Sequence, residues 1–258
     1  MKKAKHGKHQ KHNKKYIQII FIIIFIISIC SSIYYFYNAN KEKQVYKEIL
    51  NNIEIDEEQV TDERTERMLQ VEELKKENQD IIGWIEIEGT NINFPVLQGT
   101  DNQYYMEHTY TKEYSKGGSI FLDKSYDWNI PSSNLLLYGH NNKNGTMFQN
   151  LLKYKEESFY KEHPTIRFTT VDDDCQYEII SAFLSRVYYQ DETDVFRYYY
   201  FINAGDEAEY KSYIEESKKA SLYDTGKTAE YGEQLLTLST CSYHTEDGRF
   251  VVVAKKVK

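Results

Sequence analysis

The stretch TLSTCSYHTEDGRFVVVAK, residues 237–255, contains two strand-like runs joined by a short polar loop. The first run alternates and ends at Cys241, and the second opens at Arg249, directly after Asp247-Gly248. A hairpin of this kind places a cysteine across the turn from a permanent cation. Two interpretations follow from these residues. Either Cys241 is a small core residue and Arg249 a solvated strand end, or Cys241 is a thiolate nucleophile beside an oxyanion-binding arginine.

The sequence around this hairpin predicts a mainly β domain. From residue 81 onward, strand-like runs are divided by Gly, Asn and Asp turns. The expected strands are residues 82–88, 91–97, 118–122, 134–140, 165–171, 176–187, 234–241 and 249–257. Eight such runs within one domain predict a closed or nearly closed β-barrel, rich in antiparallel pairs.

Helices are expected before the barrel and within it. Residues 40–80 show helical spacing in two stretches separated by the acidic link 56–63, and these helices either form a spacer or pack on the domain. A helix is expected at 146–158, with Thr146 as its N-cap. Another is expected at 206–220, before the cysteine strand, because this segment starts acidic and ends basic.

Charge is unevenly distributed along the 258 residues. Residues 1–15 hold seven lysines, three histidines and no acidic residue, so removing them takes the formal net charge from −8 to −15. A basic tail alone is compatible with nucleic-acid binding. However, residues 17–37 carry no charge and are mostly isoleucine and aromatic, and as a helix they would span about 31 Å, one hydrocarbon thickness.

We therefore predict a membrane anchor and no nucleic-acid partner. A cleaved signal peptide is the competing interpretation, but the apolar run is long and no A-x-A site follows it. The lysines before the run place the N-terminus in the cytoplasm and the remainder outside the cell. The expected organisation is a basic cytoplasmic tail (1–16), a single-pass transmembrane helix (17–37), a helical extracellular spacer (38–80) and the barrel (81–258).

The three cysteines do not form a disulfide scaffold. Cys30 lies in the apolar run, and Cys175 follows three aspartates in an expected turn, where we expect it to be exposed. A disulfide between Cys175 and Cys241 stays open, but so low a cysteine count is not typical of a disulfide-stabilised fold. We therefore expect a free thiol at Cys241.

A histidine partner for Cys241 is expected at the end of another strand, LLLYGHN (residues 135–141). Strand alternation puts Tyr138 and His140 on one face, as it does Ser239 and Cys241. If the two strands lie side by side, His140 reaches Cys241, favours the thiolate and protonates a leaving amine.

Other assignments stay open at this level. His244, three residues after Cys241, is the main rival to His140, although its loop position suits an exposed surface histidine. An arrangement with no catalytic histidine is the third alternative. Cys241 and His244 form a C-x-x-H pair with no second pair at zinc spacing, so we expect neither a metal nor another cofactor.

These motifs resemble those of a known family. TLSTC, followed by a short loop and RFVVVAK, resembles the active-site signature of the sortases, the membrane-anchored cysteine transpeptidases of Gram-positive bacteria. LLLYGHN resembles their histidine-bearing strand. DIIGWIEIEGTNINFPVLQG (80–99) resembles the opening strands of class B sortases, and the insert 188–232 with its helix fits that class. The resemblance covers residues 78–258.

The resemblance implies an eight-stranded sortase barrel in which Cys241 is the nucleophile, His140 the general acid and base, and Arg249 the oxyanion and substrate stabiliser. Such an enzyme cleaves a C-terminal sorting signal of secreted proteins through a thioester and transfers them to an amine of a peptidoglycan precursor. Asn102, Tyr138 and Ser239 match class B substrate contacts. The alternative is that these three residues have only structural roles, as an amide in a turn, an aromatic ring of the barrel and a hydroxyl on a strand.

Competing functions also remain. One is a sortase of another class, serving pili or general anchoring, although TLSTC and the helical insert disfavour it. Another is a membrane-tethered binding module with an inert cysteine, which would show no selective labelling of Cys241. A papain-like protease is disfavoured because its cysteine precedes its histidine in the chain. Tyrosines 188, 189, 198, 199 and 200 are expected to pack or lie on the surface rather than form the site.

Overall fold

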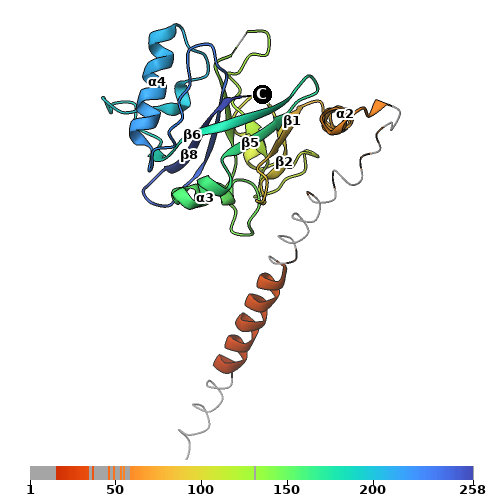
Figure 1. Ribbon diagram of the computed structural model, residues 1–258. Coiled ribbons are helices and arrows are strands. Elements are labelled where there is room, and N and C mark those ends of the chain that lie inside the picture. The colour runs from red at the N-terminus through yellow and green to blue at the C-terminus, as the bar shows by residue number, and fades with distance from the viewer. Residues whose placement is uncertain are drawn as a thin grey trace, which may run out of the picture. The chain divides into compact units, whose positions relative to one another are not determined.

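The computed structural model describes residues 16–34, 59–130 and 132–257, together with residues 37, 46, 49, 53 and 55. The chain divides into two units, Met1–Ile49 and Leu50–Lys258. In the first unit, Tyr16–Tyr34 is one helix, with a mean hydropathy of 2.5 over its most apolar window (Figure 1). This helix fits a membrane anchor or a signal sequence. The predicted basic tail, apart from Tyr16, lies outside the described residues.

The second unit contains a closed barrel with the strand order β1-β2-β3-β4-β7-β8-β6-β5. Six neighbouring pairs are antiparallel, and the pairs β2–β3 and β4–β7 are parallel. The strands are β1 Ile81–Glu86, β2 Asn93–Leu97, β3 Ile120–Leu122, β4 Asn134–Tyr138, β5 Thr165–Thr169, β6 Asp174–Arg186, β7 Leu235–Cys241 and β8 Gly248–Lys256. The predicted eight-stranded barrel is confirmed, with every strand overlapping its expected run.

Strands β4, β7 and β8 are buried on both faces, which explains their nearly continuous apolar sequences. One face, which includes Leu137, Leu238 and Val252, fills the barrel. The other face packs against the segment that connects β6 to β7, in a cluster that contains Leu136 and Val251. Five of the six site residues expected from the sequence, all except Asn102, lie at or just beyond the end of this second, covered face.

The segment between β6 and β7 carries the helix α4, Glu207–Ala220 (Figure 1). Its N-cap is Asp206, whose carboxylate accepts from the Glu209 amide at 2.9 Å. The helix buries Tyr210, Tyr213 and Ile214 against the sheet. The predicted helix at 206–220 is confirmed.

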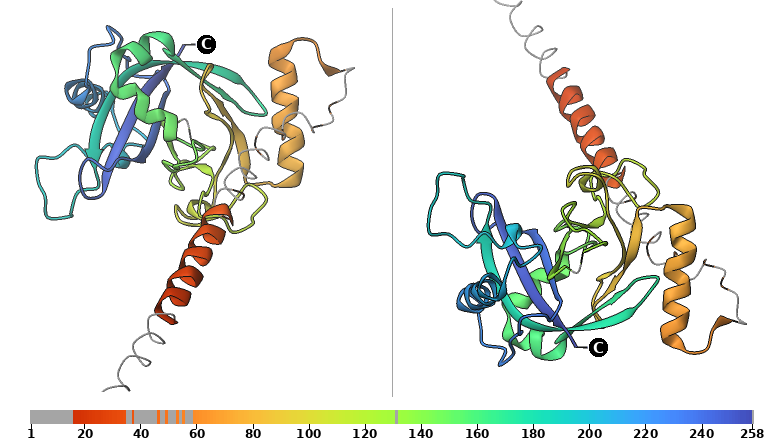
Figure 2. Two further views of the ribbon diagram at one scale, coloured as in Figure 1. Left: turned by 90° about the horizontal axis from the view of Figure 1, so that it is seen from below. Right: turned by 90° about the horizontal axis from the view of Figure 1, so that it is seen from above.

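Helix α2, Glu63–Glu77, precedes the barrel and packs against β1 (Figure 2). It buries Val71 and Leu74, and Arg67 forms an ion pair of 2.8 Å with Asp174 at the start of β6. The second of the two helices expected within 40–80 is therefore confirmed, and it packs on the domain. The first lies mostly outside the described residues, and the domain boundary at residue 80 stays a prediction.

The single helix expected at 146–158 is wrong. This segment is a 3-10 helix, η3 Gln149–Lys155, followed by the short helix α3 Glu157–Glu162. Met147 has a φ of 55°, which an α-helix cannot contain, and the Thr146 hydroxyl donates to Asn144 Oδ1 at 2.7 Å instead of capping a helix. The turn instead directs the Phe148 amide onto the His140 carbonyl, at 2.9 Å.

The expected exposure of Cys175 is also wrong. β6 begins at Asp174, so Cys175 is a strand residue paired with Phe168, and it is 5% exposed. Burial is the main factor that raises the pKa of the Cys175 thiol, to about 11. Cys30, Cys175 and Cys241 are all free thiols, so the disulfide that the sequence left open is absent.

Candidate active site

The parallel pairing of β4 and β7 brings the predicted histidine and cysteine to one rim of the barrel. Tyr138 lies opposite Ser239 in this ladder, and the Gly139 amide extends it by donating to the Ser239 carbonyl at 3.1 Å. His140 and Cys241 lie two residues beyond this pair, His140 just past the end of β4 and Cys241 at the end of β7. The two strands are therefore neighbours, which is the condition under which the sequence predicts that His140 lies beside Cys241.

Arg249 approaches Cys241 from the other neighbour of β7. The two residues are paired in the antiparallel β7–β8 ladder. Nη1 of Arg249 donates to the carbonyls of Asp247 and Gly248, at 3.1 and 3.0 Å. Within the described part of the chain, no carboxylate lies within 4.0 Å of its guanidinium. The charge is therefore available to an anionic group in the pocket.

Backbone contacts fix His140 on its side of Cys241. The Thr240 hydroxyl donates to the Gly139 carbonyl at 2.7 Å, and the Phe148 ring packs where a side chain at position 139 would lie, 2.6 Å from the ideal Cβ position. The Gly-His sequence is thus a packing requirement. His140 Nε2 lies 2.7 Å from the carbonyl oxygen of Met106.

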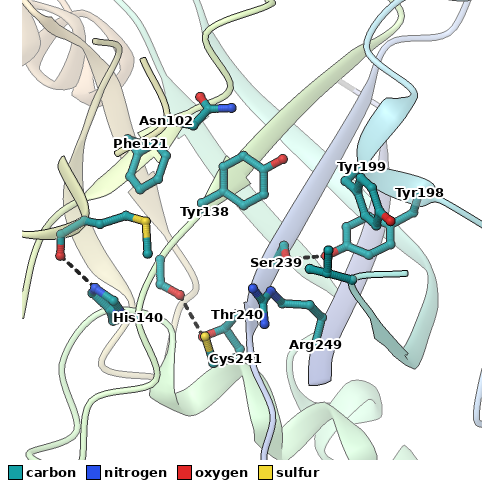
Figure 3. Close-up of a pocket in the computed structure, with 13 residues that line it drawn as sticks. Asn102, Phe121, Tyr138, His140, Tyr198, Tyr199, Ser239, Thr240, Cys241 and Arg249 are labelled. Carbon is teal, nitrogen blue, oxygen red and sulfur yellow. Dashed lines mark hydrogen bonds between the residues drawn. The ribbon is translucent and has the colours of Figure 1, made fainter. Parts of the chain in front are cut away.

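All six predicted site residues line one pocket of ≈ 240 Å³. Figure 3 shows the Arg249 side chain extended toward Cys241, with His140 on the other side of the sulfur. The full lining is Asn102, Met106, Phe121, Tyr138, Gly139, His140, Val187, Tyr198, Tyr199, Ser239, Thr240, Cys241 and Arg249. His244 is not among these residues; it is exposed, and its Nδ1 lies 3.0 Å from the Ser242 hydroxyl.

Two of the predicted substrate contacts share a buried carboxylate. Asn102 Nδ2 and the Tyr138 hydroxyl both donate to Oδ2 of Asp123, at 2.8 and 3.0 Å, and Asp123 is 5% exposed. Burial, followed by the negative charge of Asp123, raises the pKa of Tyr138. Its hydroxyl therefore stays protonated, and Asp123 holds both side chains in the pocket wall.

Ser239 is held differently. It is 1% exposed, and its hydroxyl lies 2.7 Å from the hydroxyl of Tyr198. Two residues earlier on β7, and on the same face of the strand, the Thr237 hydroxyl lies 2.9 Å from the hydroxyl of Tyr213. Two of the three hydroxyls of the TLSTC motif, those of Thr237 and Ser239, thus connect β7 to the segment that covers it.

Sequence reasoning missed part of the pocket. Tyr198 is 1% exposed and packs as expected, but it also lines the pocket beside Tyr199. Tyr200, the next residue, is 71% exposed and does not. These three neighbours form the 3-10 helix η4, Tyr198–Tyr200, which is too short to show a periodic pattern, so no sequence signal separates them. Among the described residues, no cluster of three or more His, Cys, Asp or Glu side chains could hold a metal ion.

Comparison with known proteins shows the family to which the chain belongs. The family model of the sortase domain matches residues 85–257. Sortase B of Listeria monocytogenes is 33% identical over 190 residues, which cover 73% of this chain and 74% of that protein. Sortase B of Staphylococcus aureus is 34% identical over 191 residues, covering 73% and 75%. The chain belongs to the class B sortases.

Solved structures of sortase B agree with this assignment. The Bacillus anthracis enzyme in complex with AAEK1 has a TM-score of 0.72 and 33% identity, covering 86% of this sortase and 99% of that chain. The Staphylococcus aureus sortase B–substrate complex has a TM-score of 0.73 and 30% identity, covering 85% and 97%. The predicted family and fold are confirmed, and the protein is a cysteine transpeptidase.

Proposed function

We propose that this sortase cleaves a C-terminal sorting signal of secreted proteins with Cys241 and transfers them to an amine of a peptidoglycan precursor. The observation that carries the proposal is the position of Cys241 at the end of β7. It lies between His140, which follows β4, and Arg249, its partner on β8. All three side chains line one pocket.

In the first step, the Cys241 thiolate attacks the carbonyl carbon of the scissile peptide bond and a carbon–sulfur bond forms. The carbonyl electron pair moves onto oxygen, where the Arg249 guanidinium stabilises the charge. Arg249 suits this role because it has no carboxylate partner among the described residues and cannot act as a proton donor at neutral pH.

Collapse of this intermediate breaks the carbon–nitrogen bond, and the leaving amine takes its proton from the His140 imidazolium. A thioester remains on Cys241. The amine of the cell-wall precursor then attacks the thioester carbonyl and gives its proton to His140, and the thiolate leaves. One amide bond is broken and one is formed, so the reaction needs neither an oxidant nor a cofactor.

Recognition of the sorting signal involves the wall formed by Asn102 and Tyr138. Asp123 orients both groups, which leaves the Asn102 amide and the Tyr138 ring at fixed positions beside the nucleophile. Ser239 lines the same pocket, but its hydroxyl is occupied by Tyr198. We therefore assign Ser239 a supporting role in the substrate site.

The helix Tyr16–Tyr34 supports a location in the cell membrane, with the N-terminus cytoplasmic and the catalytic unit outside. Protease added to intact cells should then digest the catalytic unit. Complete protection of that unit, under conditions in which a known surface protein is digested, would contradict this topology.

The function is tested with full-length protein in detergent micelles and a library of sorting-signal peptides, with and without amine nucleophiles. Mass spectrometry should detect cleavage within one motif and a new amide product when the amine is present. The alternative of a binding module with an inert cysteine predicts peptide binding without either product.

A further inference from the structure

The His140 ring is hydrogen-bonded on the side away from its expected reaction. Its Nε2 lies 2.7 Å from the carbonyl oxygen of Met106. A carbonyl oxygen only accepts, so Nε2 must carry the proton in this contact. Nδ1 of His140 has no hydrogen-bond partner within the described residues. The neutral ring is therefore held as the Nε2–H tautomer, with Nδ1 unprotonated.

The Met106 carbonyl is itself firmly placed. Met106 ends the short helix η2, Tyr104–Met106, and its amide donates to the Gln103 carbonyl at 3.0 Å. The preceding residue, Tyr105, is 1% exposed, and its hydroxyl donates to Asp80 Oδ2 at 2.6 Å. The buried Tyr105 side chain thus anchors the loop to the start of the barrel.

Gly118 sets the space available to this carbonyl. Its φ is 59°, and a Cβ at this position would lie 2.5 Å from the Met106 oxygen and 2.8 Å from the Met106 carbonyl carbon. Contacts this short with backbone atoms cannot be tolerated without movement. Even an alanine at position 118 would therefore displace the group that His140 binds.

We propose that the Met106 carbonyl is a positioning group for His140, which fixes the ring plane and the Nε2–H tautomer so that Nδ1 exchanges the proton with substrate. In Ser-His-Asp sites the second ring nitrogen is held by a carboxylate; here a neutral backbone carbonyl takes that place. The imidazolium keeps the same contact, because both of its nitrogens donate. This inference rests on the proposed role of His140 in proton transfer.

Gly118→Ala tests the inference, and Gly226→Ala is its matched control. Gly226 has a similar φ of 69°, but nothing lies within 4 Å of its ideal Cβ position, so the control adds the backbone strain without the contact. Full-length protein with ¹⁵N-labelled histidine is examined in micelles by NMR, which identifies the protonated ring nitrogen of His140. The His140 signals are assigned by their loss in His140→Gln.

At a pH at which the His140 ring is neutral, the parent protein should show the Nε2–H tautomer, whether or not it turns over a peptide. Gly118→Ala should shift the His140 ring signals and lower kcat by about tenfold or more, part of what a general acid contributes, with KM within about threefold. Gly226→Ala should change neither. An Nδ1–H tautomer in the parent protein overturns the inference, even if Gly118→Ala fails to fold. A folded Gly118→Ala protein with the parental His140 signals and the parental kcat also overturns it. Absence of transpeptidation by the parent would refute the proposed function instead.

Discussion

Cys241 and Arg249 are directly opposed residues of the antiparallel β7–β8 ladder. Side chains at opposed positions share a face of the sheet and have Cβ atoms about 5 Å apart. Although the loop 242–247 joins the two residues along the chain, the spacing of their backbone positions is set by the pairing of β7 with β8. A fixed spacing of this kind suits the role that we propose for Arg249, which is to stabilise charge at one point in the reaction.

Arg249→Lys should separate two roles of the arginine. Lysine keeps the charge but cannot reproduce the planar fork of hydrogen-bond donors. If the guanidinium binds the oxyanion, we expect kcat to fall by at least about 100-fold, the scale of one lost oxyanion donor. Steady-state kinetics and circular dichroism should show a folded, nearly inactive protein.

Arg64→Lys is the control, because Arg64 lies on α2 and does not line the pocket. It should retain parental kinetics. An Arg249→Lys protein with more than about a third of the parental rate would exclude the directed hydrogen-bonding role. Arg249 would then be a structural charge.

Thiol labelling should distinguish the two cysteines of the catalytic unit. Cys175 is buried and the pKa of its thiol is raised to about 11, so it should stay protonated and unlabelled near pH 8. Cys241 is partly exposed in the pocket and should react with an electrophilic probe. The measurement uses peptide mapping in a Cys30→Ser background. Equal labelling of Cys175 and Cys241 in folded protein would contradict this account.

The Tyr198–Ser239 hydrogen bond should matter for both stability and activity. Tyr198→Phe leaves the buried Ser239 hydroxyl without its partner, which should lower the free energy of unfolding by about 1–3 kcal/mol. Tyr213→Phe removes the corresponding contact to Thr237, outside the pocket, at a smaller cost in stability because the Thr237 hydroxyl keeps its hydrogen bond to Asn134 Oδ1, at 2.8 Å. We expect only Tyr198→Phe to lower kcat/KM.

A double-mutant cycle with Ser239→Ala isolates the coupling between the two hydroxyls. Additive losses of stability from Tyr198→Phe and Ser239→Ala would show that the two groups do not interact in solution.

Acid should weaken the contact of the β5–β6 turn with β8. The hydrogen bond from Lys256 lowers the pKa of Asp173 to about 2, from an ordinary 3.8. Because the folded-state pKa is depressed, the stabilisation is fully present above pH 3.8 and is lost as the pH falls toward 2. Asp173→Asn should therefore cost about 1 kcal/mol at neutral pH, the upper end for a partly exposed pair, and almost nothing at pH 2.

Asp172→Asn makes the same change of charge at an exposed neighbour and should be neutral at both pH values. Chemical denaturation at each pH provides the measurement. If Asp173→Asn lowers the free energy of unfolding as much at pH 2 as at neutral pH, the ion pair is not the cause of the loss.

The strands could be predicted, above all those that lead to His140 and Cys241, because the pattern that specifies each strand lies within its own short stretch of sequence. Apolar runs that end at His140 and Cys241 define both the elements and their reactive ends, and only the parallel pairing of β4 with β7 was left to the fold. The failures have local causes that periodicity does not encode. The positive φ of Met147 is incompatible with the expected helix, and β6 begins two residues earlier than expected, which buries Cys175.

Several of the remaining pocket residues come from two 3-10 helices that are too short to show a periodic pattern. Tyr198 and Tyr199 line the pocket while Tyr200 is exposed, and the Met106 carbonyl carries no side-chain signal at all. Such positions depend on how these short helices are placed beside the barrel strands. The sequence alone therefore predicted which of the candidate reacting groups share a pocket, but not the neighbouring groups that contact them.

The thioester on Cys241 tests the central claim most directly. Full-length sortase is incubated with its sorting-signal peptide without an amine, quenched in acid, digested and mapped by mass spectrometry. We predict an acyl group on the peptide that contains Cys241, released by hydroxylamine and converted to an amide product when the amine is added. An acyl group on another residue, or amide formation by Cys241→Ala at the parental rate, would contradict the account.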